Sequence, residues 1–487
     1  MAALFKKSAY KADFTILFFV FAVSRAVLTW SGVHFNITPL YWFFQFLDPL
    51  YLKSDLFRSL LYLHSQPPGF NLFLGIVLKL FSGHELLVFK TIYLLIGLSM
   101  TILLYLMSRK LKIPPMIALP VTIFFSISPP ILLLENWLFY TYPVTFLLLV
   151  SCFFLYKYLE KNRRLYLFLF FCTIGSIVLT RTLFHTIWMM AAIAGLILFQ
   201  KKEIKKIILC AALPLLIIFA VHIKNYLIFH QISLSSWFGM NLIKMTWTVP
   251  VDELRSSVEN EEVSEIAGIM PFRPPEVYSN YANFDTVTGI PVLDEKYKST
   301  GYINFNHIAY ISISDHYLDA AKYLITRYPG CYGLSIIKAL YTYLRPCSDS
   351  VIISGHNRKA IKGWVDFYEK YLIGDILSKV WSADFINRAG QARKVHLNYL
   401  YLFIPFIYLW SILLAVRGDR ALTPPGKYKP LPVFICYNII YVTTVGNLIE
   451  MSENMRFRFL LLPFIYIILM NILKYCFKKT EPEVPWK

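Results

Sequence analysis

Residues 86–107 read LLVFKTIYLLIGLSMTILLYLM, and basic side chains follow at Arg109, Lys110 and Lys112. A helix of about 20 residues crosses the hydrocarbon core of a bilayer, so this apolar run predicts a membrane span. Similar runs recur along the chain. Because lipid offers no hydrogen-bond partner to a bare backbone, repeated runs of this kind predict an all-α bundle of transmembrane helices.

The composition points to the same class. The chain has 487 residues, of which 57% are hydrophobic, 17% aromatic and 16% charged, whereas an average soluble domain is about 25% charged. The formal net charge is +19. In a soluble protein such an excess would suggest nucleic acid. Here the basic residues lie in short loops between apolar runs, which is the pattern of a topology signal, and we expect no nucleic-acid partner.

The basic loops predict an orientation. Lys6, Lys7 and Lys11 precede the first run, 14–33, and place the N-terminus in the cytoplasm. That run is too long for a typical signal peptide and lacks a small-residue cleavage site, so we expect an uncleaved anchor. With the C-terminus also cytoplasmic, ten spans are predicted, at 14–33, 86–107, 114–133, 138–157, 165–180, 184–199, 207–224, 396–416, 431–449 and 458–476.

A further apolar stretch, 67–81, is too short for an ordinary span. If it crossed the membrane, every later basic loop would change sides and break the positive-inside rule. We therefore predict a re-entrant or interfacial helix there.

These assignments divide the chain into three parts. Residues 1–224 form an N-terminal transmembrane module whose first outer loop is 34–68, and 396–487 form a C-terminal one. Residues 225–395 are expected to form a large extracytoplasmic domain, since aromatic residues run through them and argue against disorder. Cys331 and Cys347 lie in this part. An oxidising compartment would allow them to pair, and the sequence leaves the paired and the free states open.

Under this topology five groups of polar residues meet at the outer face. Acids and bases gathered at one end of a bundle are typical of a site at the membrane boundary. Single members also have structural readings, since aspartates cap helices and basic side chains reach lipid headgroups. The groups are Asp48, Lys53, Asp55, Arg58, His64 and Gln66; Glu135 and Asn136; Arg181 and His185; Lys224, Asn225 and Tyr226; and Glu450, Glu453, Asn454, Arg456 and Arg458.

Two motifs carry a resemblance to a known family. The segment Leu47-Asp48-Pro49 through Leu63-His64-Ser65-Gln66-Pro67-Pro68 combines an outward acidic loop with a His and Pro-Pro element that opens a helix. It resembles the GT-C superfamily of membrane glycosyltransferases, and more narrowly the bacterial relatives of protein O-mannosyltransferases and of the lipid A aminoarabinose transferase. The segment Glu450-Met-Ser-Glu453-Asn454-Met-Arg456-Phe-Arg458-Phe is similar to an element near the end of such chains. In layout the resemblance covers 10–230 and 396–476.

The resemblance implies an activity. Such enzymes take a sugar from a polyprenyl phosphate or diphosphate and transfer it at the extracytoplasmic face, usually with inversion. An acid of the first outer loop activates the acceptor, commonly in an adjacent Asp-Glu pair. This chain instead has Asp48-Pro49 and Asp55-Leu56. Asp48 is favoured by its order after the first span, and Asp55 stays open.

The chemistry of such a transfer assigns roles. It needs a base on the acceptor hydroxyl and cations on the departing phosphate. The candidate bases are Asp48, Asp55 and Glu135, and the candidate phosphate ligands are Arg181, His185, Arg456 and Arg458. The substrate would be positioned by His64, Gln66, Lys224, Asn225, Glu450, Glu453 and Asn454. Carboxylates suit Mg²⁺ or Mn²⁺, so Asp48, Asp55 or Glu135 could hold one, although the sequence requires no cofactor.

Two other functions remain open from the sequence. A transporter or flippase of lipid-linked sugars would favour duplicated halves and charges deep in spans. No duplication is evident, and only Arg25 lies well inside a span. A scaffold whose long loop binds a partner is the other alternative. For the glycosyltransferase, the acceptor is a lipid, a glycan or a protein, and the resemblance to bacterial chains favours a bacterial inner membrane over the endoplasmic reticulum.

Overall fold

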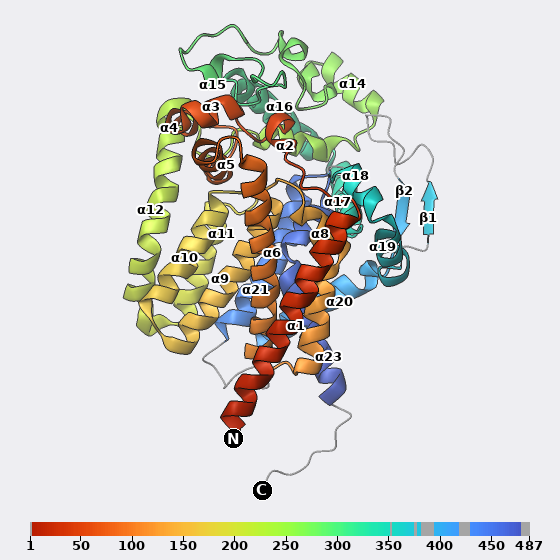
Figure 1. The fold of residues 1–487 in the computed structure, drawn as a ribbon. Coiled ribbons are helices and arrows are strands. Elements are labelled where there is room, and N and C mark those ends of the chain that lie inside the picture. Colours follow the sequence, from red (N-terminus) through yellow and green to blue (C-terminus); the bar gives the residue numbers. More distant parts are fainter. Residues whose placement is uncertain (1, 351–352, 375–376, 381–393, 418–428, 479–487) are drawn as a thin grey trace.

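The computed structural model describes residues 2–350, 353–374, 377–380, 394–417 and 429–478. Helices make up nearly all of the regular structure in these ranges, with one antiparallel pair of short strands, β1 (Leu377–Val380) and β2 (Lys394–Leu397). The helices form a bundle with irregular and helical segments stacked on one end, as Figure 1 shows. The fold is that of a helical membrane protein.

Six helices in the described part of the chain are long and apolar enough to span a membrane. Two further helices, α7 (Pro115–Ile127) and α8 (Pro129–Glu135), would form a seventh span together, but they meet at a bend of 50°. Pro129 and Pro130 start α8 and remove the backbone donors that would continue α7. The six are α1 (Ala2–Trp30), α6 (Glu85–Lys110), α9 (Thr141–Lys161), α12 (Ile204–Phe229), α20 (Leu400–Arg417) and α21 (Pro430–Ile449).

The remaining predicted spans are also helices, but shorter ones. They are α10 (Arg164–Val178), α11 (Thr186–Phe199) and α23 (Leu462–Lys478), the last preceded by the short α22 (Met455–Leu460). Helix length and composition therefore support six or seven spans, and the count of ten stays a prediction.

Three of the basic loops that were predicted to share one side of the membrane lie together, whereas residues 418–428 of a fourth lie outside the described residues. Lys206 donates to the carbonyl of Asn162 over 2.9 Å, which joins the turn after α9 to the start of α12. Lys110, at the end of α6, lies 3.7 Å from Glu160. The first turns of α1 and the last turns of α23, the helix Leu462–Lys478, are at this same end of the bundle (Figure 1). We call it the basic end and the opposite one the outer end.

The outer end begins with the first outer loop. It folds into α2 (Pro39–Trp42), α3 (Pro49–Ser54) and α4 (Leu56–Leu61), and α5 (Pro68–Leu80) follows. The predicted re-entrant or interfacial stretch is thus a helix of 13 residues. It lies beside α3 and α4 at the outer end (Figure 1).

Residues 230–343 form a cap over this end. It has its own apolar core, which includes Trp237, Tyr310 and Tyr317. Gly239 allows α13 to touch α16, because a Cβ at this position would lie 1.8 Å from the carbonyl oxygen of Ser314. The cap helices are α13 (Phe238–Leu242), α14 (Val251–Glu259), α15 (Pro291–Asp294), α16 (Ala309–Arg327) and α17 (Pro329–Tyr343).

The rest of the predicted extracytoplasmic domain returns to the bundle. Tyr343, Ile353 and Val365 belong to the same apolar core as the transmembrane helices. The segment contains α18 (Gly355–Ala360) and α19 (Lys362–Phe367), and residues 381–393 lie outside the described residues. Cys331 and Cys347 are both free thiols, so the pairing left open by the sequence does not form.

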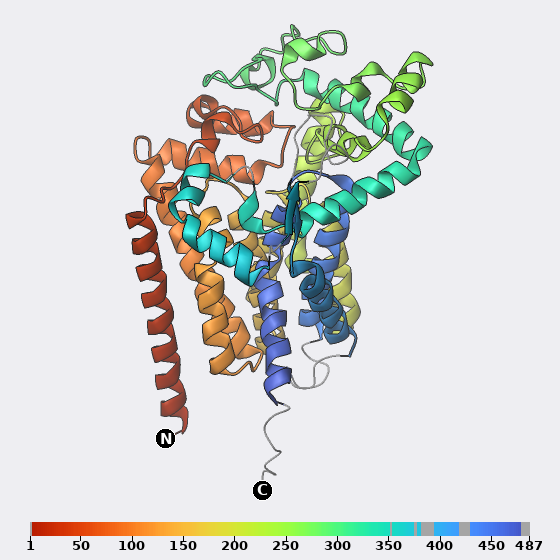
Figure 2. The same ribbon diagram turned by 90° about the vertical axis from the view of Figure 1, so that its right-hand side faces the viewer.

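Helix α1 stands at the edge of the bundle, as Figure 2 shows. Only 22% of its most apolar window is buried inside the protein, so most of its surface would face lipid. A polar contact near its outer end ties it down, through Arg25.

Candidate functional site

Glu135, one of the candidate bases, is buried in an ion pair with Arg25. Arg25 donates through Nε to Oε1 at 2.9 Å and through Nη2 to Oε2 at 2.7 Å. Tyr142 adds a third donor to Oε2 at 3.0 Å. Gly97 makes room for the group, since a Cβ there would lie 2.2 Å from Oε2. With 1% of its surface exposed, Glu135 is placed to hold α1 and α8 together, and its role as a base stays a prediction.

Asp48 is also buried, at 4% exposure, but only a thin turn covers it. Its Oδ1 accepts from the backbone N–H of Leu50 at 2.8 Å, so the side chain caps α3. Ser299 of the cap donates to the same carboxylate with its hydroxyl, at 2.6 Å, and with its backbone N–H. Ser299 itself is exposed. Asp48 therefore sits directly beneath the outer surface with a hydroxyl already in contact.

The cap grips the first outer loop on either side of Asp48. Lys298 is buried and donates to the carbonyl of Phe43 at 2.8 Å. Tyr51 bonds Glu295, and Thr300 donates to the carbonyl of Tyr41 at 2.8 Å. Burial lowers the pKa of Lys298 to about 7, against the opposing pull of Asp48.

Asp55 has a different setting. It is exposed and caps α4, accepting from the backbone N–H of Arg58 at 3.4 Å. A solvated cap acid of this kind has no unusual environment, so the structure separates the two aspartates that the sequence left as alternatives.

His64 has a structural setting. Its Nδ1 pairs with the Ser236 hydroxyl at 2.8 Å and its Nε2 with the carbonyl of Asn306 at 3.0 Å. Burial lowers the pKa of His64 to about 3, so the ring stays neutral at physiological pH. It fastens the cap to the segment that leads into α5. The adjacent Gln66 is buried and makes no hydrogen bond among the described residues.

Lys224 and Asn225 of α12 act nearby as ties. Lys224 donates to the carbonyl of Leu63 at 2.6 Å, and Asn225 donates to the carbonyl of Ser233. Both bonds fix backbone segments around His64, and the predicted positioning of substrate by these two residues stays a prediction.

Arg458 and Asn454 also hold backbone in place. Arg458 donates to the carbonyls of Tyr343 and Arg345, the latter at 2.7 Å, and so caps the carboxyl end of α17. Asn454 donates to the carbonyl of Glu450 at 2.8 Å and to the side chain of Asn447 at 3.0 Å. These contacts occupy the guanidinium that was predicted to meet phosphate.

Arg181 and Arg456, unlike Arg458, lie against aromatic rings rather than backbone carbonyls. The guanidinium of Arg181 lies over the ring of Tyr140, at 4.9 Å, and over Phe457, at 5.0 Å. That of Arg456 lies 5.5 Å from the ring of Phe139. The rings of Phe139 and Tyr140 are 4.0 Å apart, so the two guanidiniums rest on neighbouring rings.

These guanidiniums have unused donors. Nε and Nη1 of Arg181 and Nη1 of Arg456 are buried and have no hydrogen-bond partner among the described residues. Arg181 is 5% exposed. Burial lowers its pKa, and Arg456 adds to this, while Tyr140 and Glu450 oppose it. A buried donor without a hydrogen-bond partner is costly, and this arrangement leaves donors for an anion.

A third cation reaches the same place from the cap. Lys244 lies 5.0 Å from the ring of Phe272 and 3.8 Å from Glu450. Burial lowers the pKa of Lys244, Glu450 raises it, and Arg456 lowers it. We call Arg181, Lys244 and Arg456 the cation cluster. Glu450 lies among the three, and Glu453 pairs with Arg456 at 3.1 Å.

The other predicted residues fall outside this cluster. His185 is exposed, with its ring 6.3 Å from that of His222. Asn136, the residue that follows α8, lines a groove together with Arg25 of α1. Among the described residues, no group of three histidine, cysteine or acidic side chains is arranged to hold a metal ion. The predicted Mg²⁺ or Mn²⁺ site therefore gains no ligand set from these side chains.

Comparison with protein-family models, with curated proteins and with solved structures found no match. The fold and the side-chain geometry therefore carry the functional argument by themselves.

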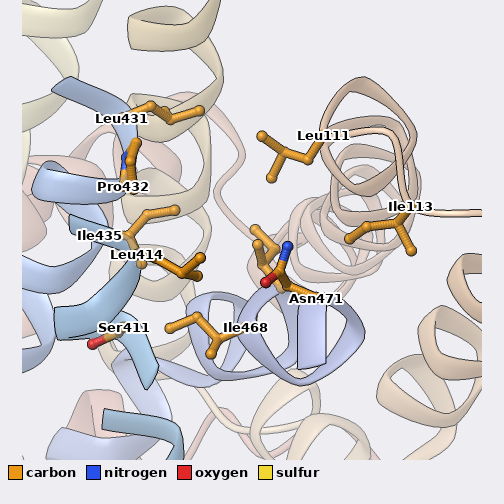
Figure 3. Close-up of a pocket in the computed structure, with 10 residues that line it drawn as sticks. Leu111, Ile113, Ser411, Leu414, Leu431, Pro432, Ile435, Ile468 and Asn471 are labelled. Atoms are coloured by element: carbon orange, nitrogen blue, oxygen red, sulfur yellow. The ribbon is translucent and has the colours of Figure 1, made fainter. Parts of the chain in front are cut away.

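A small apolar pocket lies elsewhere. Figure 3 shows it between α20, α21 and α23, close to the turn that follows α6. Leu431, Ile435 and Ile468 are typical of its apolar lining, to which Ser411 and Asn471 add polar atoms. It belongs to the basic end, and it offers no charge to a substrate.

Sequence reasoning missed Lys244 and Ser299. Both lie in the predicted extracytoplasmic domain, 225–395, and neither stands in a motif. The convergence of Arg181 and Arg456 had a signal, because both were predicted at the outer face. Nothing in the spacing indicated that Phe139 and Tyr140 would support them.

Proposed function

We propose that the chain is a glycosyltransferase of the GT-C type. It would move a sugar from a polyprenyl-phosphate donor to an acceptor at the outer face of a bacterial inner membrane. Both termini would then be cytoplasmic, on the side that carries the basic loops. The reaction is an inverting displacement that uses an aspartate base.

The observation that carries this proposal is the cation cluster. Two arginines and a lysine converge at the outer end, and the arginines keep buried donors that have no hydrogen-bond partner in the described part of the chain. A guanidinium binds phosphate oxygens with two parallel hydrogen bonds, and a water-poor setting strengthens them. The apolar helices below supply a place for an isoprenoid tail, so a phosphate on a lipid fits better than a soluble one.

The rest of the chemistry falls to Asp48. The acceptor hydroxyl attacks the anomeric carbon and loses its proton to the carboxylate, while the bond from carbon to the phosphate oxygen breaks. The polyprenyl phosphate leaves with the bonding electron pair, and Arg181 and Arg456 neutralise the charge that develops on it. A general base must come within about 2.6–3.2 Å of the proton it takes. The hydroxyl of Ser299 sits at 2.6 Å from Asp48 and marks a position that meets this condition.

The test is donor binding and transfer by the purified full chain in nanodiscs, with a radiolabelled polyprenyl-phosphate sugar. Arg181→Gln and Arg456→Gln should each weaken donor binding by at least about tenfold, since a hydrogen bond to a charged group contributes about 1.5–3 kcal/mol. Arg255→Gln, an exposed arginine of α14, is the matched control and should bind as the wild type does. Unchanged binding in both cluster variants would reject the phosphate site.

The transporter alternative gives a different result in the same preparation. Sealed vesicles containing the chain would take up or turn over the labelled lipid without forming a new glycosidic bond. Product that appears only when the acceptor fraction is added, and in the absence of flux, supports the transferase.

A further inference from the structure

A second polar site lies on the lipid-facing side of the bundle, away from the cation cluster. A groove open to the outside runs between the outer ends of α1 and α6. Arg25, Lys90 and Asn136 give it polar atoms, and Leu28, Val33 and Leu94 give it apolar walls.

The charges of the groove do not balance. Arg25 is neutralised by Glu135, with which it shares two hydrogen bonds. The side chain of Lys90 makes no hydrogen bond and no ion pair among the described residues. The groove thus keeps one positive charge that the described part of the chain does not compensate. A basic side chain close to the membrane surface attracts anionic lipid headgroups, so an anion from outside the chain is expected.

The position of Lys90 along α6 indicates which anion it would meet. It is five residues past Glu85, where α6 starts, and so about 7.5 Å along the helix axis. Trp30, which ends α1 and lines the same groove, is 91% exposed. Tryptophan favours the level of the lipid headgroups. Lys90 and Trp30 therefore bracket the layer in which phospholipid phosphates lie.

We propose that this groove is a binding site for one anionic phospholipid. Its phosphate contacts the Lys90 ammonium, and one acyl chain follows Leu28, Val33 and Leu94 between α1 and α6. A phosphodiester carries one negative charge, which matches the single uncompensated cation. Because α1 is otherwise weakly covered by protein, the bound lipid also fills the space that separates it from α6.

The experiment is native mass spectrometry of the purified full chain with added phosphatidylglycerol. Lys90→Gln should lower retention of the lipid about fivefold, the factor expected when a basic side chain near an anionic lipid contributes about 1 kcal/mol. Lys90→Arg should retain it. Lys79→Gln, an exposed lysine at the end of α5, is the matched control and should behave as the wild type does.

A second variant separates charge from space. Ala26→Phe leaves Lys90 in place but fills the groove, and it should release the lipid to a similar extent. Thermal unfolding of each variant in detergent checks that the fold is retained. If Lys90→Gln does not fold, lipid retention by Ala26→Phe tests the proposal instead. The proposal is overturned if Lys79→Gln loses as much lipid as Lys90→Gln, if Lys90→Gln retains the wild-type amount, or if millimolar inorganic phosphate displaces the lipid.

Discussion

The hydroxyl of Ser299 donates a hydrogen bond of 2.6 Å to Oδ1 of Asp48, across the boundary between the cap and the first outer loop. The backbone N–H of Ser299 bonds Oδ2, so both carboxylate oxygens are engaged by one residue. The turn that carries Ser299 is closed by a bond from the N–H of Gly301 to the carbonyl of Lys298, and Gly301 has a φ of +80°. An acceptor hydroxyl that reaches Asp48 must take the place of the Ser299 hydroxyl.

This relationship predicts that the two aspartates behave differently when each loses its charge. Asp48→Asn should lower sugar transfer by about 10²-fold or more, because removal of a general base has that effect. Asp55→Asn should transfer sugar normally, since asparagine caps a helix as well as aspartate does and Asp55 is exposed. Both variants should bind the donor normally. Transfer rates with the labelled donor decide this, and equal rates for Asp48→Asn and wild type would remove Asp48 from the reaction.

A second prediction concerns the buried pair of Arg25 and Glu135. Arg25→Met leaves a buried carboxylate without its partner and should cost about 3–5 kcal/mol of stability. The double variant Arg25→Met with Glu135→Leu should lose much less, because no charge is left uncompensated. Gly97→Ala should destabilise as well, since its Cβ would collide with Glu135. Thermal unfolding in one detergent measures all three, and a double variant as unstable as Arg25→Met would contradict the pairing argument.

Substitutions of the two arginines of the C-terminal motif, Arg456 and Arg458, should also have different effects. Arg458→Lys loses the fork that holds the carbonyls of Tyr343 and Arg345, and its unfolding temperature should fall. Arg456→Lys should fold as the wild type does and instead bind the donor less tightly, because lysine cannot make a bidentate contact with phosphate. Both quantities are measured on both variants: the unfolding temperature should fall only in Arg458→Lys, and the donor affinity should fall only in Arg456→Lys. Loss of affinity without loss of stability in Arg458→Lys would assign it to the substrate.

His64 predicts a pH dependence of stability. Its pKa is lowered by burial to about 3 in the folded chain, against about 6.5 in an unfolded one. The unfolded chain therefore binds more protons between these values, and stability must rise with pH across this window. The contribution is complete above about pH 6.5 and is lost as the pH falls toward about 3. Denaturation at several pH values gives the free energy of unfolding as a function of pH. Its slope should be shallower for His64→Gln than for the wild type, whereas His84→Gln, at an exposed position, should keep the wild-type slope.

The helices could be anticipated because their cause is local. An apolar run of sufficient length becomes a helix in lipid whatever surrounds it, and every predicted span between 86–107 and 458–476 contains one. The break at Pro129 had a local cause too, yet the span 114–133 was predicted as continuous. The shortness of α10 and α11 leaves the count of crossings to measurements of topology.

The site was predictable only in part. Arg181, Arg456 and Glu450 were recognised as outward polar residues, and tertiary structure brings them together. Arg458 looked like Arg456 in sequence, and only the fold shows that its donors are taken by backbone carbonyls. The same holds for His64, whose motif suggested substrate but whose ring nitrogens are both engaged by the cap.

By itself the sequence determined the class of protein, the positions of the apolar helices and the end of the bundle where polar residues gather. These features follow from hydropathy and from the charge of the loops, both of which can be read from a stretch of sequence about one helix long. Only the tertiary structure decided that Ser299 covers Asp48, that Lys244 joins two arginines and that Lys90 has no counterion within the ranges that the structure describes. Such relationships join residues separated by long stretches of chain, and their energies depend on burial and distance, which no local pattern records.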